Sequence, residues 1–219
     1  MQKQILTMLE MQEQINERIH PQWRSQNFNW RRAVVIETSE MIDHYGWKWW
    51  KKQEPNIEQV KLELVDIWHF LLGSILSKGK SLFNDSDSLE SKAKYIEQYF
   101  TKYYPEKKYD FLISADRLHY CSSESNDLRL EPFIHCLNNI GMSFDDLYTS
   151  YISKNVLNFF RQDNGYNTGE YNKIWNGKED NEHLVEIVST LDSSNHNFKD
   201  LLLQELEKRY SNLIPTTSS

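Results

Sequence analysis

The sequence predicts an all-α protein, a helical bundle, on three observations. Apolar residues recur every three or four positions over several stretches longer than ten residues, which is the period of an amphipathic helix. Gly and Pro are scarce, with 7 and 5 among 219 residues, and alternating β-branched runs are nearly absent. A hydrophobic fraction of 39% is enough to build a core, and no convincing linker divides the chain, so one domain over residues 1–219 is expected.

Each predicted helix follows from an apolar repeat and from the residues that end it. Pro21 separates the first helix from the second, and Pro55-Asn56 separates the second from the third. Polar stretches over residues 77–88 and 122–127 are expected to be loops. The predicted helices span residues 3–19, 32–47, 58–76, 89–103, 109–121, 130–140, 144–163, 181–191 and 197–210.

The long helix over residues 144–163 has the clearest boundaries. It follows a break at Gly141, with Ser143 as the N-cap and Asp146 three residues later, where its carboxylate can complete a capping box. Asn164-Gly165 ends the helix. The next segment, to residue 180, has no clear period and is expected to be a structured loop.

Composition limits the classes of function. A formal net charge of −7 argues against binding to a nucleic-acid polymer, which needs clustered Lys and Arg, but it leaves a single nucleotide open as a ligand. Cys121 and Cys136 are the only cysteines and lack the spacing of a metal site. The N-terminus shows no targeting signal and no segment has 18 uninterrupted apolar residues, so a reduced, cytoplasmic protein that does not span a membrane is expected.

Two pairs of carboxylates lie within the second and third predicted helices. They are Glu37-x-x-Glu40 and Glu63-x-x-Asp66. At 100° per residue each pair shares an arc with apolar side chains, so the carboxylates are expected to face inward or to line a cleft. An ionised carboxylate in such a place is costly unless it is paired or binds a metal. A hard cation such as Mg²⁺ is the simplest compensation, although each pair alone is weak support in so acidic a sequence.

Cations and amides add a second constellation. Lys154, Asn158 and Arg161 form one stripe on the long helix, which can face an anion, although charged stripes more often face water. Further donors for a polyphosphate occur in two segments, as Lys48, Lys51 and Lys52, and as Tyr166, Tyr171, Lys173 and Lys178. On the first helix, Gln12 and Asn16 project from one face, and their amides match the alternating donors and acceptors of a uracil edge. As an isolated pair, these two amides are more simply surface residues.

Four segments form a set when they are taken together. They are MQEQIN (11–16), WRRAVVIETSEMIDHYGWKWWK (30–51), ELVDIWHF (63–70) and residues 153–181, which include KNVLNFFRQ and WNGKEDN. The set resembles the motifs of the dimeric, all-α dUTPases, a family of the helical nucleoside triphosphate pyrophosphohydrolase superfamily that also includes the MazG proteins. The resemblance covers most of residues 8–76 and 144–190, in the same order, and leaves a variable region at about 77–130 unmatched. It implies a core of four helices with additional helices, and a homodimer.

The resemblance also implies roles for individual residues. Glu37, Glu40, Glu63 and Asp66 would be catalytic and would bind two or more Mg²⁺ ions, and Gln12 and Asn16 would meet the uracil. The phosphates and the sugar would be bound by Lys48, Lys51, Lys154, Asn158, Arg161, Tyr166 and Lys173.

The implied reaction is Mg²⁺-dependent hydrolysis of dUTP, and of dUDP, to dUMP, which clears dUTP from the nucleotide pool and supplies dUMP for thymidylate synthesis. Glu37 is our choice for the carboxylate that activates water. Cytosine would leave the amides of Gln12 and Asn16 unsatisfied. Thymine would be excluded by a wall against its methyl group, for which the candidates are Trp30, Trp47, Trp49 and Trp68.

Three alternatives stay open. The same metal shell could serve a broader dNTP pyrophosphohydrolase, because base choice depends on few side chains. Asp66-x-x-His69 also resembles an element of di-iron bundles, although the nearest second pairing, Glu40 to His44, has the wrong spacing. A nucleotide-binding regulator with a degenerate site would keep the fold without turnover, but all four acidic positions are present.

Overall fold

The computed structural model describes residues 1–78, 88–106, 109–124, 130–193, 195 and 197–213. The fold class is all-α, as predicted, and a two-stranded antiparallel hairpin is the sheet found in the described part of the chain. The α-helices are α1 (Gln2–Ile19), α2 (Trp30–Tyr45), α3 (Ile57–Ser77), α4 (Leu89–Tyr103), α5 (Phe111–Glu124), α6 (Leu130–Asn139), α7 (Phe144–Asp163), α8 (Asp180–Val188) and α9 (Phe198–Ser211). Shorter elements are η1 (Trp23–Ser25), η3 (Tyr166–Thr168), β1 (Ile174–Trp175) and β2 (Lys178–Glu179).

The predicted helices match the observed ones to within three residues at each end. Helix α2 begins and ends two residues earlier than predicted, and α8 ends at Val188, so residues 189–191 lie outside it. Residues 122–124 belong to α5 and not to a polar gap, because the helix continues past its last apolar turn. The segment expected to be a structured loop contains η3 and the hairpin. The capping box of Ser143 and Asp146 is present at the start of α7. Most of the loop predicted over residues 77–88 lies outside the described residues, as do residues 125–127.

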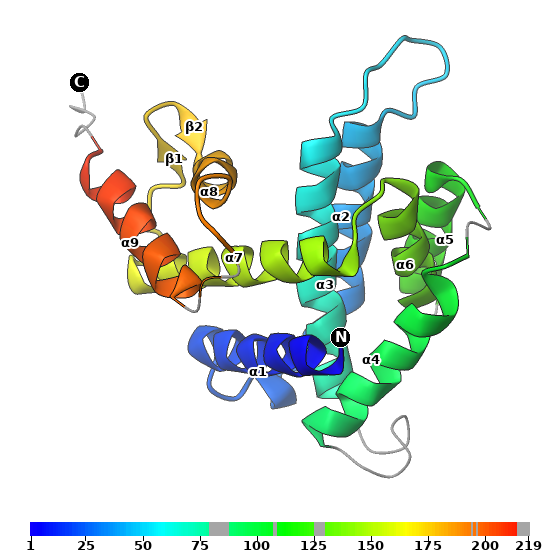
Figure 1. The fold of residues 1–219 in the computed structure, drawn as a ribbon, viewed down its shortest axis with the longest axis horizontal. Coiled ribbons are helices and arrows are strands. Elements are labelled where there is room, and N and C mark those ends of the chain that lie inside the picture. Colours follow the sequence, from blue (N-terminus) through cyan, green and yellow to red (C-terminus); the bar gives the residue numbers. More distant parts are fainter. Residues whose placement is uncertain (79–87, 107–108, 125–129, 194, 196, 214–219) are drawn as a thin grey trace.

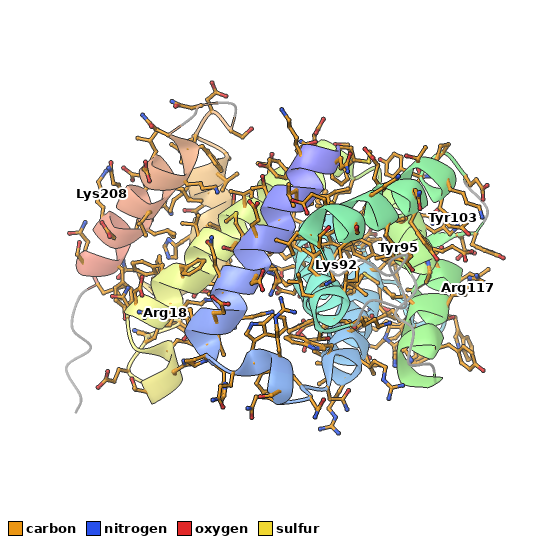
Figure 2. The ribbon with its side chains drawn as sticks, turned by 90° about the horizontal axis from the view of Figure 1, so that it is seen from below. Arg18, Lys92, Tyr95, Tyr103, Arg117 and Lys208 are labelled. Atoms are coloured by element: carbon orange, nitrogen blue, oxygen red, sulfur yellow. The ribbon has the colours of Figure 1, made fainter. Side chains whose placement is uncertain are left out.

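Helices α2 and α3 stand side by side as an antiparallel pair, and α1 and α7 cross them (Figure 1). Seen from below, α1 runs alongside α7, and Arg18 near the end of α1 forms an ion pair with Asp163 (Figure 2). The hairpin and α9 pack at the C-terminal end of α7 and α8 packs along its middle, whereas α4, α5 and α6 lie on the other side of the α2–α3 pair (Figure 1). The bundle therefore brings α1, α2, α3 and α7 around one central space.

Trp68 of α3 connects the helices at the centre of the core. It is fully buried, stacks on Phe133 of α6 at 5.1 Å between ring centroids, and meets Phe100 of α4 edge to face. Its indole N–H points at the sulfur of Met8 on α1. Burying aromatic side chains of this size stabilises the contact of the four helices by several kcal/mol.

A second aromatic cluster fixes the C-terminal elements. Trp175 of β1 is fully buried and packs with Phe160 of α7, Tyr171 and Tyr210 of α9. This cluster holds the segment that follows α7 against the end of that helix. None of the described helices is long and apolar enough to cross a bilayer.

Candidate active site

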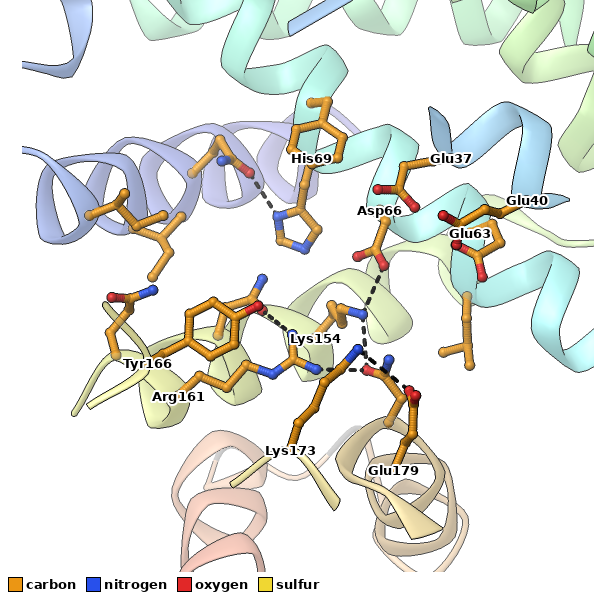
Figure 3. Close-up of a pocket in the computed structure, with 18 of the residues that line it drawn as sticks. Glu37, Glu40, Glu63, Asp66, His69, Lys154, Arg161, Tyr166, Lys173 and Glu179 are labelled. Atoms are coloured by element: carbon orange, nitrogen blue, oxygen red, sulfur yellow. Dashed lines mark hydrogen bonds and ion pairs between the residues drawn. The ribbon is translucent and has the colours of Figure 1, made fainter. Parts of the chain in front are cut away.

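A cavity of about 1080 Å³ lies between α1, α2, α3 and α7. Figure 3 shows its acidic side chains on α2 and α3 facing the cations of α7 and of the segment after it. Most of the predicted site residues line this cavity, and they come from segments far apart in the sequence. These are Gln12, Asn16, Glu37, Glu40, Glu63, Asp66, Lys154, Asn158, Arg161, Tyr166 and Lys173.

Three of the four predicted carboxylates form a compact triad. One oxygen from each of Glu37, Glu63 and Asp66 lies within 4.8 Å of the others. The helical period explains the grouping, because Glu63 and Asp66 lie one turn apart on α3 and Glu37 faces them from α2. Glu63 is buried, Glu37 and Asp66 are half-buried, and Glu40 is exposed beside the triad.

The triad is electrostatically unfavourable without a cation. Burial first, and then the charge of Asp66, raise the pKa of Glu37 and of Glu63 well above the ordinary value of 4.5. His44 lies nearby, with Nε2 at 3.5 Å from a Glu63 oxygen, but its ring does not join the triad. Three clustered oxygen donors fit a hard divalent cation such as Mg²⁺, which would relieve this repulsion.

Lys154 connects the acidic side of the cavity to its basic side. Its ammonium lies 2.9 Å from Oδ2 of Asp66 and 2.9 Å from Oδ1 of Asn181 at the start of α8. The side chain is only 4% exposed. The stripe on α7 therefore faces the cavity, and the alternative of a solvated helix face is wrong.

Arg161 is held two turns further along α7. Its Nε and one terminal nitrogen donate to the two oxygens of Asp180, at 2.8 and 2.7 Å, and its other terminal nitrogen donates to Asn158 at 3.2 Å. Burial alone would raise the pKa of Asp180, but the hydrogen bonds and charge of Arg161 outweigh it and lower that pKa. The planar guanidinium is thus fixed by a bidentate pair.

Two residues beyond α7 complete the basic side. Tyr166 of η3 lies near Arg161, with the guanidinium carbon 5.9 Å from the ring centroid. The ammonium of Lys173 lies 3.5 Å from Glu179, and both residues line the cavity. Glu179 is the N-cap of α8, so the positive end of that helix also points toward this region.

Lys48 and Lys51 lie outside the cavity lining. Lys48 pairs with Asp43 at 3.2 Å and lies over the ring of Trp47. Lys51 is exposed in the connection between α2 and α3. The predicted contact of these two lysines with phosphate stays a prediction that the geometry of the cavity does not support.

Gln12 and Asn16 are buried, each only 4% exposed, so the simpler expectation of a surface pair is wrong. Gln12 Nε2 donates to Asn16 Oδ1 at 2.9 Å. The Asn16 amide nitrogen has no hydrogen-bond partner among the described residues. An unpaired buried donor on a cavity wall is free to bind a ligand.

His69 entered the sequence analysis only through the di-iron alternative, and its side chain lies on the cavity wall. Its Nδ1 lies 2.8 Å from Gln12 Oε1, and its buried Nε2 has no partner within the described chain. Burial lowers the pKa of His69 to about 3, so the ring is neutral. In the sequence, only the i+3 spacing from Asp66 indicated that His69 lies near the acidic residues. Its contact with Gln12 of α1 depends on how the helices pack and could not be predicted.

Comparison with known families decides between the alternatives for this site. A family model described as dUTPase matches residues 4–166. The chain belongs to the dUTPase family. As a member of this all-α family, which is consistent with a relationship to the MazG proteins, it is a dUTP diphosphatase that acts on a small nucleotide. No curated protein matches the sequence.

The dUTPase match covers α1 to α7 and therefore all four acids, both amides and the α7 stripe. It ends at Tyr166, so Lys173, Asp180 and Asn181 lie beyond it. Family membership and a carboxylate triad that excludes His69 both argue against the di-iron alternative. Activity as a dUTP diphosphatase likewise replaces the alternative of a non-catalytic regulator.

Proposed function

We propose that this dUTPase hydrolyses dUTP, and also dUDP, to dUMP in a Mg²⁺-dependent reaction at the cavity between α1, α2, α3 and α7. The observation that carries the proposal is the opposition of the Glu37–Glu63–Asp66 triad to Lys154 and Arg161 in one cavity. A polyphosphate with bound metal ions would suit both the acidic and the basic residues of this cavity, because the metal ions would bind the carboxylates and the phosphates would bind the Lys and Arg donors.

Four carboxylates would hold the metal. Glu37, Glu63 and Asp66 would supply the central oxygens, and Glu40 on the exposed side of α2 would supply a further one for a second ion. When bound, Mg²⁺ supplies charge neutralisation and acidifies a coordinated water. Glu37, which faces Glu63 and Asp66 from α2, would orient the attacking water and accept its proton.

The cations would bind the phosphate oxygens whose charge the metal does not neutralise. Arg161 and Lys173 face the triad across the cavity, and Lys154 reaches from α7 to Asp66 (Figure 3). Asn158, beside Arg161, would meet the sugar, and Tyr166 would cover the phosphate end. A substrate held from both sides is fixed in position for attack on phosphorus.

The uracil would bind at the α1 end of the cavity. Because the oxygen of the Gln12 amide can only accept, His69 Nδ1 carries the proton and Nε2 presents a lone pair. Asn16 Nδ2 presents a donor. This pair matches the N3–H of uracil and a neighbouring carbonyl, whereas the N3 of cytosine would place a lone pair against a lone pair.

Trp30 is the tryptophan that lines the base end of the cavity among the four considered for a wall against the thymine methyl. Trp68 is buried in the core, and Trp47 and Trp49 are exposed. Trp30 is partly buried against α3, where Gly73 provides room for its ring: a Cβ at Gly73 would lie 2.8 Å from it. Such a rigid aromatic wall would reject an added methyl group.

A substrate panel tests the function directly. The protein is incubated with each dNTP and with dUDP in Mg²⁺ and in EDTA, and the products are identified by chromatography. We expect dUMP with pyrophosphate from dUTP and dUMP with phosphate from dUDP, in Mg²⁺ alone. Equal hydrolysis of dCTP and dUTP would instead establish the broader dNTP pyrophosphohydrolase.

The homodimer implied by the family and the cytoplasmic location are further expectations. Light scattering on the purified full chain measures the first, and fractionation of expressing cells measures the second. The net charge of −7 argues against binding to a nucleic-acid polymer, and a mobility-shift assay measures this.

A further inference from the structure

Asp180 is a fully buried carboxylate next to the phosphate end of the catalytic cavity. It is the first residue of α8, it is 0% exposed, and it does not line the cavity. Its carboxylate accepts three hydrogen bonds: two from Arg161, at 2.8 and 2.7 Å, and one from the hydroxyl of Tyr171 at 2.8 Å. A buried carboxylate with this many donors is held rigidly and stays ionised.

The three hydrogen bonds connect three separate elements. Arg161 belongs to α7, Tyr171 belongs to the segment between η3 and β1, and Asp180 begins α8. Tyr171 stacks on Tyr210 of α9 at 5.3 Å, which anchors it from the other side. The segment that carries Tyr166 and Lys173 is therefore tied to α7 through one carboxylate.

The same pair sets the direction of the Arg161 guanidinium. Nε and one terminal nitrogen face Asp180, and Asn181 and Asn158 accept weaker hydrogen bonds at 3.3 and 3.2 Å. Because the guanidinium is planar, fixing one edge fixes the other. The nitrogen beside Asn158 keeps an N–H for a ligand on the cavity side.

We propose that Asp180 is a positioning residue for the phosphate end of the site: through Arg161 and Tyr171 it orients the donors that bind the polyphosphate, without touching the nucleotide itself. The inference rests on the proposed function. It assigns to Asp180 an effect on the phosphates and none on the base, because the uracil end, at Asn16 and His69, is built from α1 and α3.

The test compares ligands that differ only in their phosphates. Dissociation constants are measured for the non-hydrolysable analogue 2′-deoxyuridine 5′-(α,β-imido)triphosphate and for deoxyuridine in the wild type and in Asp180→Asn, which keeps the shape and removes the charge. We expect affinity for the triphosphate analogue to fall by about tenfold or more, as a lost charge-assisted contact requires. Affinity for deoxyuridine should stay within about twofold.

A matched control is Asp163→Asn. Asp163, at the end of α7, also pairs with an arginine, but its partner is Arg18 of α1 and the pair lies on the exposed surface. This variant should leave both affinities unchanged. If Asp180→Asn does not fold, Tyr171→Phe removes one of the three hydrogen bonds while the Arg161 pair remains, and it should weaken triphosphate binding by about threefold with deoxyuridine unaffected.

Equal losses for the two ligands in Asp180→Asn, or in Tyr171→Phe where the first variant does not fold, would show a general structural role and overturn the proposal. Unchanged triphosphate affinity would overturn it as well. These outcomes are distinct from failure of the proposed function, in which the wild type itself would not hydrolyse dUTP in Mg²⁺.

Discussion

The ammonium of Lys154 lies 2.9 Å from Oδ2 of Asp66, and the Lys154 side chain is only 4% exposed. This ion pair joins the acidic half of the site to its basic half. Each partner is buried enough that loss of the other leaves a charge poorly compensated. The pair is the point at which the two halves of the site depend on each other.

Replacing Lys154 with Met should therefore reduce kcat/KM for dUTP by about 10²-fold, the usual effect of removing one donor that stabilises developing charge. Steady-state kinetics with product detection measure it. Lys61→Met is the control, because Lys61 pairs with Glu58 at 2.8 Å and does not line the cavity. Wild-type activity in Lys154→Met would show that the Lys154 ammonium has no part in the reaction.

Metal binding should stabilise the fold. On the proposal that Mg²⁺ binds the folded triad and not the unfolded chain, the ion at about 100 times its dissociation constant would add about 2.7 kcal/mol to the free energy of unfolding. Calorimetry with Mg²⁺ and with EDTA should show a higher Tm with Mg²⁺ in the wild type, and a much smaller difference in Glu63→Gln. Asp43→Asn, an acid of α2 that pairs with Lys48, should respond like the wild type. A full Mg²⁺ response in Glu63→Gln would place the metal elsewhere.

The free energy of unfolding should fall as the pH is lowered, because the folded protein holds His69 in its neutral form. Burial lowers its folded-state pKa to about 3, whereas the unfolded side chain takes up a proton below about 6.5. The unfolded state then binds more protons between these values, so the stability contributed by His69 is present above pH 6.5 and is lost as pH falls toward 3. The loss amounts to about 2 kcal/mol at pH 5.

Urea unfolding at pH 7 and pH 5, in EDTA, measures this effect in the wild type and in His69→Gln. The variant lacks the titrating ring, so its free energy of unfolding should decline by about 2 kcal/mol less over the same interval. Identical declines in the two proteins would mean that His69 is protonated in the folded state.

Gly73→Ala should both destabilise the protein and deform the base end of the cavity. The added Cβ would lie 2.8 Å from the ring of Trp30, which contacts Phe70 and lines the cavity. Overpacking of this kind costs about 1–3 kcal/mol. Urea unfolding should show that loss, and KM for dUTP should rise because Trp30 must shift. Ser39→Ala, on the exposed face of α2, is the control and should change neither value.

Local patterns predicted the helices well because a helix repeats every 3.6 residues and ends at recognisable caps. The start of α7 shows this, since the capping box of Ser143 and Asp146 follows from the spacing of two residues in the sequence and is confirmed. The hairpin at Ile174–Trp175 and Lys178–Glu179 was not predicted, because two-residue strands are too short to show a period. Residues 122–124 were missed because a short polar run at the end of a helix has no apolar period to mark it.

The sequence by itself determined the all-α class, the placement of the two acid pairs on a cleft and the likeness to the dUTPases, since these depend on residue order and local spacing. Tertiary structure decided which groups meet. It brought Glu37 but not Glu40 into the triad, left Lys48 and Lys51 outside the cavity, and joined His69 to Gln12 and Asp180 to Arg161. The reason is physical: periodicity fixes the direction of a side chain from its own helix, whereas a site forms where helices cross, and the crossing depends on the packing of the whole core.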